Sequence, residues 1–389
     1  MALFKRTKII NRSRIMREIW INREISRVEI ARSLGLDKST VSNNIGELLD
    51  IGVVVESSEG EAGPQGGRKP VNIKLNKKFG CVIGIEIRPE SYTAVVVDLE
   101  GEILFSRYEK IRVSGENLIE EFTKTVDLIR EEMNRKKIDL LGIGVGISGV
   151  VNSREGLIKY SIPLEIVDEY RFIEKASKLY GVPIFIDNDA NACVWGELAF
   201  HRRKELKDFI FLLLELREND PQNSRLADKI GVGIGLVING QVHYGIDYSA
   251  GEFRSIERHE NSVGQFSLTA EEQRVVESDA RVRAKFLHEL GRHVALMVNT
   301  FNLSHVILGG YFERYDQDVF HIFEEEIRAN WPYPYPYDID HNIWLSSFGD
   351  KAVAYGAAGM VLNKLFTDLE LMEDSNTLKT IHADFTQEK

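Results

Sequence analysis

The chain has 389 residues, enough for two or three domains, and its content of 43% apolar and 28% charged residues is typical of a globular protein. The longest apolar run, 209–214, is far shorter than the roughly 20 residues that span a bilayer. The N-terminus has no apolar signal core, so we expect a cytoplasmic protein without membrane contact. With only Cys81 and Cys193, the chain can build neither a disulfide framework nor a cysteine-rich metal site.

The net charge of −11 is unevenly distributed along the chain. Residues 1–80 carry 15 Lys and Arg against 9 Asp and Glu, a net charge of +6. The remainder carries 34 against 51, a net charge of −17. A basic first fifth on an acidic body indicates that the N-terminal part meets a polyanion, and the motifs must identify it.

The first predicted elements are helices separated by a tight turn. A helix is expected over residues 11–20. Ser26 and Glu29 form a capping box, in which each residue bonds the backbone N–H of the other, and this box opens a short helix at 27–34. Gly35 ends that helix, because glycine readily adopts the left-handed conformation of a helix terminus.

The next predicted helix, 38–50, has a buried stripe and a polar face. Asp37 is in position to cap it. The spacing of a buried stripe is followed by Val41, Ile45, Leu48 and Leu49. The opposite face has short hydrogen-bonding side chains, which suit close contact with base edges in a major groove. The residues expected to contact DNA are Lys38, Ser39, Thr40, Ser42, Asn43 and Asn44. A helical hairpin used for protein contacts is the alternative.

Two strands, 52–56 and 71–75, follow and are joined by a segment rich in glycine and polar residues, which predicts a wing. Within it, Arg68 and Lys69 form a slim basic arm that can enter a minor groove. A flexible linker is the alternative. The pattern from Asn11 to Pro70 resembles the DNA-binding module of repressors of the ROK family (repressors, open reading frames and kinases).

The rest of the chain alternates strands and helices, which predicts an α/β body in two lobes with ligand in the cleft between them. The expected strands are 81–87, 93–99, 103–108, 141–147, 183–186, 209–216, 230–238, 241–245 and 306–308. The expected helices are 117–135, 170–180, 274–301 and 350–365.

Several segments of this body resemble the sugar-kinase part of the ROK family, which implies its actin-like, ribonuclease-H-like fold. They are 187–191 with Gly196 and Glu197, the glycine run 231–235, 250–252, 299–302 with 308–310, and 354–358. With the first module, the resemblance covers nearly the whole chain.

The resemblance implies a sugar site. By it, Asn188 bonds sugar hydroxyls, Asp189 matches the family's catalytic base, and Glu252 accepts from further hydroxyls. Arg254 stands near the position of a family histidine, where it either donates to hydroxyls, favours an acidic ligand, or is an exposed or salt-bridged side chain. The alternative for Asp189 is the N-cap of a helix that follows a strand.

Two departures from the family pattern bear on function. The family's phosphate turn, Gly-Ile-Asp-x-Gly-Gly-Thr, is replaced at 84–90 by Gly-Ile-Glu-Ile-Arg-Pro-Glu. Pro89 has no N–H and Glu90 adds negative charge, so we expect no ATP binding, Asp189 as a vestigial base, and no enzyme activity. Residues 255–275 contain no cysteine, so neither a metal nor another cofactor is expected.

The segment 331–337 alternates proline and aromatic residues. Such a segment is extended and either stacks on a sugar, lines a subunit contact, or is a rigid surface loop.

The sequence thus predicts a winged helix-turn-helix domain (1–78), a sugar-binding body (79–370) and a polar tail (371–389). The function predicted is a sugar-responsive repressor that binds double-stranded operator DNA as a homodimer or dimer of dimers and releases it when sugar binds. An active ATP-dependent sugar kinase with a DNA-binding module and a regulator controlled by a protein partner are the alternatives. The sugar, the operator and the sign of the response stay open.

Overall fold

A computed structural model describes residues 2–59, 71–201, 206–217, 229–315, 318–333 and 342–367. The predicted arm residues Arg68 and Lys69, the end of the proline-rich segment and the tail from 371 lie outside these ranges. Within them, no helix is both long and apolar enough to cross a membrane.

The N-terminal domain contains three helices and a three-stranded sheet of order β1-β3-β2. The elements are α1 (Ala2–Asn22), β1 (Glu24–Ser26), α2 (Arg27–Leu34), α3 (Lys38–Ile51), β2 (Val54–Glu59) and β3 (Val71–Leu75). The predicted capping box at Ser26 and Glu29 is present, and Gly35 ends α2 with φ 62°. Asp37 occupies the N-cap of α3, but the structure gives its side chain no capping hydrogen bond. Of the predicted stripe on α3, Val41, Ile45 and Leu48 are buried and Leu49 is half-buried.

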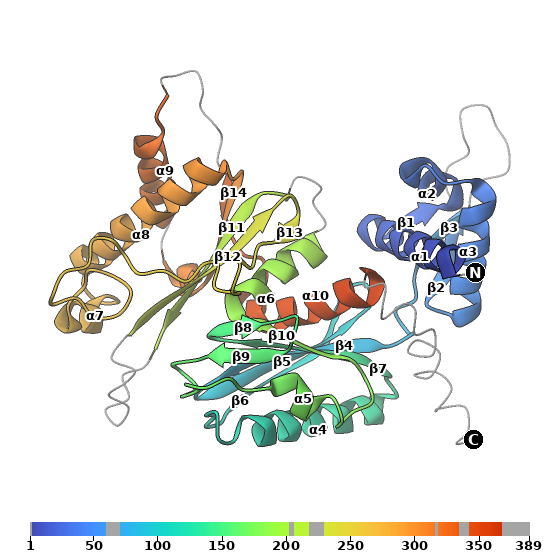
Figure 1. Ribbon diagram of the computed structural model, residues 1–389, viewed down its shortest axis with the longest axis horizontal. Helices are drawn as coiled ribbons and strands as arrows, with labels where there is room; N and C mark the ends of the chain where they lie inside the picture. Colours follow the sequence, from blue (N-terminus) through green and yellow to red (C-terminus); the bar gives the residue numbers. More distant parts are fainter. Residues whose placement is uncertain are drawn as a thin grey trace.

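The first lobe of the body is a five-stranded sheet of order β10-β7-β4-β5-β6. Its strands are β4 (Cys81–Arg88), β5 (Ser91–Asp98), β6 (Ile103–Lys110), β7 (Leu140–Ile147) and β10 (Ile184–Asn188). The helices α4 (Leu118–Lys136) and α5 (Phe172–Ala176) lie on one side of it (Figure 1). A small ribbon, β8 (Val150–Asn152) with β9 (Leu157–Tyr160), adds Val150 and Tyr160 to the lining of a cavity described below.

The second lobe repeats this topology. Its sheet has the order β13-β12-β11-β14-β15, so in both lobes the third, second, first, fourth and fifth strands of the sheet follow one another in space. The strands are β11 (Phe209–Leu216), β12 (Ile230–Ile238), β13 (Gln241–Val242), β14 (His305–Gly310) and β15 (Asn342–Leu345). The helices that pack with it are α7 (Ala270–Val275), α8 (Ala280–Phe301) and α9 (Asp318–Asn330).

Two helices lie between the lobes, α6 (Asp189–Gly196) and α10 (Ala352–Thr367) (Figure 1). All of α10 is buried except Asn363, Lys364 and Thr367. Its backbone lies directly on α6 and the first sheet, because a Cβ on Gly356 would collide with the carbonyl oxygen of Ala192 and one on Gly84 with that of Ala354. Glycine is required where two backbones approach this closely.

The far end of α10 contacts the N-terminal domain. The rings of Trp20 on α1 and Phe366 on α10 meet edge to face with centroids 5.7 Å apart, and Ser13 Oγ donates to the Thr367 carbonyl at 3.4 Å. Trp20 and Phe366 belong to one apolar core that joins the two domains. A single buried helix therefore contacts both α6, between the lobes, and α1 of the N-terminal domain.

Candidate functional site

The polar face of α3 is largely accessible. Lys38, Ser39, Ser42 and Asn43 are exposed and Thr40 is half-buried, so the structure leaves these predicted DNA contacts available. Asn44 is different, because it is buried and its Nδ2 donates to the Thr40 carbonyl at 2.8 Å.

The burial and the intrahelical bond of Asn44 therefore argue against the predicted contact of this side chain with DNA. The 3.6-residue period of the helix turns it toward the stripe of Val41 and Ile45. Glu47, farther along α3, forms ion pairs with Lys8 and Arg12 of α1, which fix the angle of the helix against its neighbour.

The second site is built where β10 leads into α6, at the carboxyl end of a parallel strand. Three consecutive residues there have separate roles. Asp187 is fully buried and accepts from Tyr244 Oη at 2.6 Å, Trp195 Nε1 at 3.2 Å and Asn191 Nδ2 at 3.3 Å. Burial raises the pKa of Asp187 to about 6, although these bonds oppose the shift. Asp187 therefore holds the strand end in place and does not face the cavity.

Asn188 is the N-cap of α6. Its Oδ1 accepts from Ala190 N at 2.9 Å and from Asn191 N at 3.3 Å, and its Nδ2 donates to the Gly149 carbonyl at 2.9 Å. The cap role that the sequence left open for Asp189 thus belongs to Asn188. A second Nδ2 hydrogen stays available to a ligand in the cavity that Asn188 lines.

Asp189, the first residue of α6, is 7% exposed. Its Oδ1 accepts from the N–H of Ala190 at 2.8 Å. Burial, followed by the negative charge of Glu215, raises the pKa of Asp189 well above its usual value. Hydroxyl donors from a ligand would satisfy such a carboxylate, which has few partners of its own.

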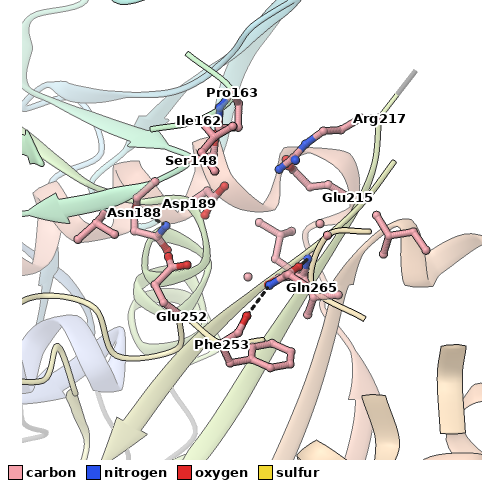
Figure 2. Close-up of a pocket in the computed structure, with 18 of the residues that line it drawn as sticks. Ser148, Ile162, Pro163, Asn188, Asp189, Glu215, Arg217, Glu252, Phe253 and Gln265 are labelled. Carbon is pink, nitrogen blue, oxygen red and sulfur yellow. Dashed lines mark hydrogen bonds and ion pairs between the residues drawn. The ribbon is translucent and has the colours of Figure 1, made fainter. Parts of the chain in front are cut away.

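A cavity of about 460 Å³ brings the four predicted ligand-binding residues together (Figure 2). Asn188 and Asp189 come from the start of α6, whereas Glu252 and Arg254 come from the irregular segment after β13. Glu252 points toward Asp189 and Asn188 across the cavity (Figure 2). The four residues therefore line one cavity. That they contact a ligand there stays a prediction.

The cavity also contains residues that sequence reasoning missed, namely Ser148, Tyr160, Ile162, Pro163, Glu215, Arg217, Phe253 and Gln265. Glu215 and Arg217 could have been suspected, because they are charged residues at the end of an apolar strand that precedes a glycine run. One glycine of that run has a structural cause, because a Cβ on Gly235 would lie 2.8 Å from the carbonyl oxygen of Ala190 in α6.

The site of the altered phosphate turn carries a chain of ion pairs. Buried Glu86 accepts from Arg88 Nε at 2.6 Å, Arg88 Nε lies 3.5 Å from Glu215, and Glu215 lies 3.6 Å from Arg217 Nη2. Burial raises the pKa of Glu86 to about 7, which the charge of Arg88 offsets only partly.

This chain of ion pairs lies between the cavity and a neighbouring one of about 730 Å³, which includes Pro89 and Glu90. Arg88 links β4 of the first lobe to β11 of the second.

Two further predictions concern metal binding and the aromatic residues at the start of the proline-rich segment. Among the described residues, no group of three His, Cys, Asp or Glu side chains is arranged to hold a metal ion. Trp331 and Tyr333 meet edge to face, with centroids 5.6 Å apart, after the end of α9, and neither is among the residues that line the 460 Å³ cavity.

Comparisons with known proteins agree with this two-part architecture. Residues 82–263 match the model of the ROK family, and residues 10–55 match a winged helix-turn-helix DNA-binding model. Along the chain, the match to a winged helix-turn-helix model thus precedes the match to the ROK family model.

The chain is 28% identical over 251 residues to the xylose repressor of Bacillus subtilis (strain 168), covering 63% of this chain and 59% of that repressor. It thus spans less than two thirds of that relative's length.

Two solved structures share the fold. A ROK family transcriptional regulator, described as a homologue of the E. coli MLC protein, has a TM-score of 0.76 at 19% identity, covering 96% of this chain and 100% of that one. A ROK glucokinase from Streptomyces griseus, in complex with glucose and AMPPNP, has a TM-score of 0.54 at 19% identity, covering 72% of this chain and 99% of that one. At these identities the likeness establishes the fold alone.

Proposed function

We propose that this chain is a sugar-responsive transcriptional repressor of the cytoplasm, which binds operator DNA as a homodimer, or a dimer of dimers, and releases it when a sugar enters the body. Each protomer would set the exposed face of α3 in a major groove, with Arg68 and Lys69 in the flanking minor groove. The xylose repressor of Bacillus subtilis supports this reading by its name and its similarity.

The observation that carries the proposal is buried Asp189, which faces a cavity of about 460 Å³ in a chain that begins with a winged helix-turn-helix. Cavities of several hundred cubic ångströms suit small molecules. Asn188, Asp189 and Glu252 supply both acceptors and a donor, which a ring of hydroxyl groups can match.

The charge of the cavity favours a neutral sugar over a sugar acid. Asp189, Glu215 and Glu252 place three acidic side chains on the cavity, and after burial the negative charges of Glu215 and Glu252 contribute to the raised pKa of Asp189. An anionic substituent on the ligand would meet the same repulsion.

We propose further that the protein is not an enzyme. The N–H groups of a phosphate turn would be needed to bind ATP, and Pro89 has none. Arg88 is engaged by Glu86 and Glu215. Sugar-dependent ATP turnover at a rate typical of kinases would refute this part of the proposal.

Release of DNA requires that the sugar favours one arrangement of the lobes over another. The contacts of α10 support a direct route for this effect. The helix packs on α6, whose first residue is Asp189, and ends against Trp20 of the DNA-binding domain.

The test is a thermal-shift screen of the full chain against neutral monosaccharides (D-xylose, D-glucose, D-galactose and D-mannose) and the corresponding sugar acids. We expect a neutral sugar to raise the melting temperature, and Asp189→Ala to abolish the shift while ligand-free DNA binding is kept. A variant that still responds to the sugar would show that the cavity is assigned wrongly.

A further inference from the structure

A long irregular loop, residues 243–269 between β13 and α7, carries part of the candidate sugar site. Glu252, Phe253 and Arg254 of this loop line the cavity. Loops of this length without secondary structure are uncommon, and they hold a ligand-binding geometry only when side chains fasten them. The fastening contacts are therefore as important to the site as the residues that line it.

The first contact is made by Gln265. Its Oε1 accepts from Val232 N at 2.7 Å and its Nε2 donates to the Val232 carbonyl at 2.9 Å. One side-chain amide thus pairs both backbone groups of Val232, as a neighbouring strand would, on a part of β12 that β13 does not reach. Gln265 Nε2 also lies 3.5 Å from the Phe253 carbonyl, next to Glu252 (Figure 2).

The second contact is made by Ser255, which is 5% exposed. Its N–H donates to the Gln265 carbonyl at 2.8 Å, and its Oγ exchanges a hydrogen bond with His293 Nε2 of α8 at 2.9 Å. Ser255 therefore ties the two ends of the segment 255–265 together and fixes both to a helix of the lobe core.

The third contact is an ion pair two residues farther on. Arg292 of α8 donates to both oxygens of Glu257, at 2.7 Å and 2.6 Å. A bidentate pair contributes direction as well as attraction. Arg292 and His293 are adjacent on α8, which is held in the lobe by buried Leu290 and Val294.

We propose that these five residues, Gln265, Ser255, Glu257, Arg292 and His293, form a clasp that positions Glu252 for the sugar. The inference rests on the proposed function. Ser255, Glu257, Arg292 and His293 are positioning residues, since they are absent from the cavity lining and act through the loop. Fastened in advance, the loop loses little conformational freedom when a ligand binds.

The experiment compares His293→Leu with His293→Gln in the full chain. Leucine removes the bond to Ser255, whereas the amide of glutamine can restore it. Asn299→Leu is the matched control, because Asn299 lies on the same helix but donates to the Ile327 carbonyl and to Asn330, each at 3.0 Å, and contacts no residue of the clasp. Affinity is measured by calorimetry for the monosaccharide of the panel that gives the largest thermal shift with the wild type, and hydrogen exchange is followed in the peptides that cover 243–269.

The clasp predicts that His293→Leu weakens sugar affinity at least tenfold and speeds exchange in the loop. His293→Gln should recover most of both effects, and Asn299→Leu should match the wild type in sugar affinity and in loop exchange. DNA affinity without sugar should be the same in all four proteins.

Unchanged sugar affinity in His293→Leu would overturn the clasp and leave the proposed function intact. A wild type that binds no sugar of the panel would overturn both. If glutamine fails to restore affinity, the hydrogen bond to Ser255 is not the cause and the clasp as described is wrong.

Discussion

At the scale of single residues, the environment assigns different tasks to neighbours of similar chemistry. Asp187 and Asp189 are separated by one residue and both are buried, yet Asp187 is bonded to Tyr244, Trp195 and Asn191 whereas Asp189 faces the cavity. Asn188 between them caps the helix. A continued strand would place Asp187 and Asp189 on the same face, but the strand ends at Asn188 and α6 begins at Asp189, so the backbone turns and the two carboxylates diverge.

Glu86 gives a pH-dependent prediction. The folded protein holds its proton up to about pH 7, whereas the unfolded chain releases it near the usual pKa of 4.5. Stability is therefore lost as pH rises from about 4.5 to 7 and stays lower above that range. The glutamine of Glu86→Gln cannot ionise. Between pH 5 and pH 8 we therefore expect the free energy of unfolding to fall by about 1–3 kcal/mol less in this variant than in the wild type.

Urea unfolding of both proteins at the two pH values measures this difference. An equal loss of stability in wild type and variant would show that Glu86 is charged in the folded state across the whole range.

At the scale of elements, the amphipathic pattern of α3 has a different consequence for each of two adjacent asparagines. Asn43 is exposed on the polar face, and Asn44 is buried against its own helix. We expect Asn43→Ala to weaken DNA binding by about 1–3 kcal/mol without changing the melting temperature.

Asn44→Ala is its matched control. It should lower stability by about 1 kcal/mol, because a buried hydrogen bond is lost, and leave the DNA affinity of the folded protein nearly unchanged. Anisotropy titration against duplexes selected from a random pool, with melting curves, separates the two effects. The reverse pattern would mean that α3 meets DNA through another face.

The elements that sequence analysis predicted are those with a clear period or a turn signal. The strands β4, β7, β11 and β12 and the helix α4 lie close to their predicted positions. The predicted helix 274–301 is two helices, because Asp279 caps α8 by accepting from the N–H groups of Arg281 and Val282.

Helix α6 was predicted only through the alternative interpretation of Asp189 as an N-cap, because it is buried nearly all round and its sequence has no polar face to set a period. Of the candidate site, only the residues that lie in or beside a sequence motif were predicted. Gln265 and Ser255 come near the site through a loop whose path no local pattern encodes.

At the scale of the whole molecule, the junction of α1 with α10 is the place where we propose that sugar binding affects DNA binding. Phe366 packs on Trp20 in the core that joins the domains. We expect Phe366→Leu to bind the sugar and the DNA nearly as the wild type does, but to reduce the sugar's effect on DNA affinity at least threefold, since the edge-to-face contact is lost.

Phe312→Leu is the control, because Phe312 is fully buried in the core of the second lobe, away from α10. We expect the two substitutions to lower the free energy of unfolding by similar amounts. Equal loss of coupling in the two would mean that general softening of the body, rather than this junction, reduces the response.

The most direct test of the account is the DNA affinity of the full wild-type chain, measured with and without a saturating concentration of the sugar identified by the screen. The account predicts that sugar weakens binding to a selected duplex between about fivefold and 150-fold, the usual range for coupled sites. The same affinity in both conditions, with sugar bound, would contradict it.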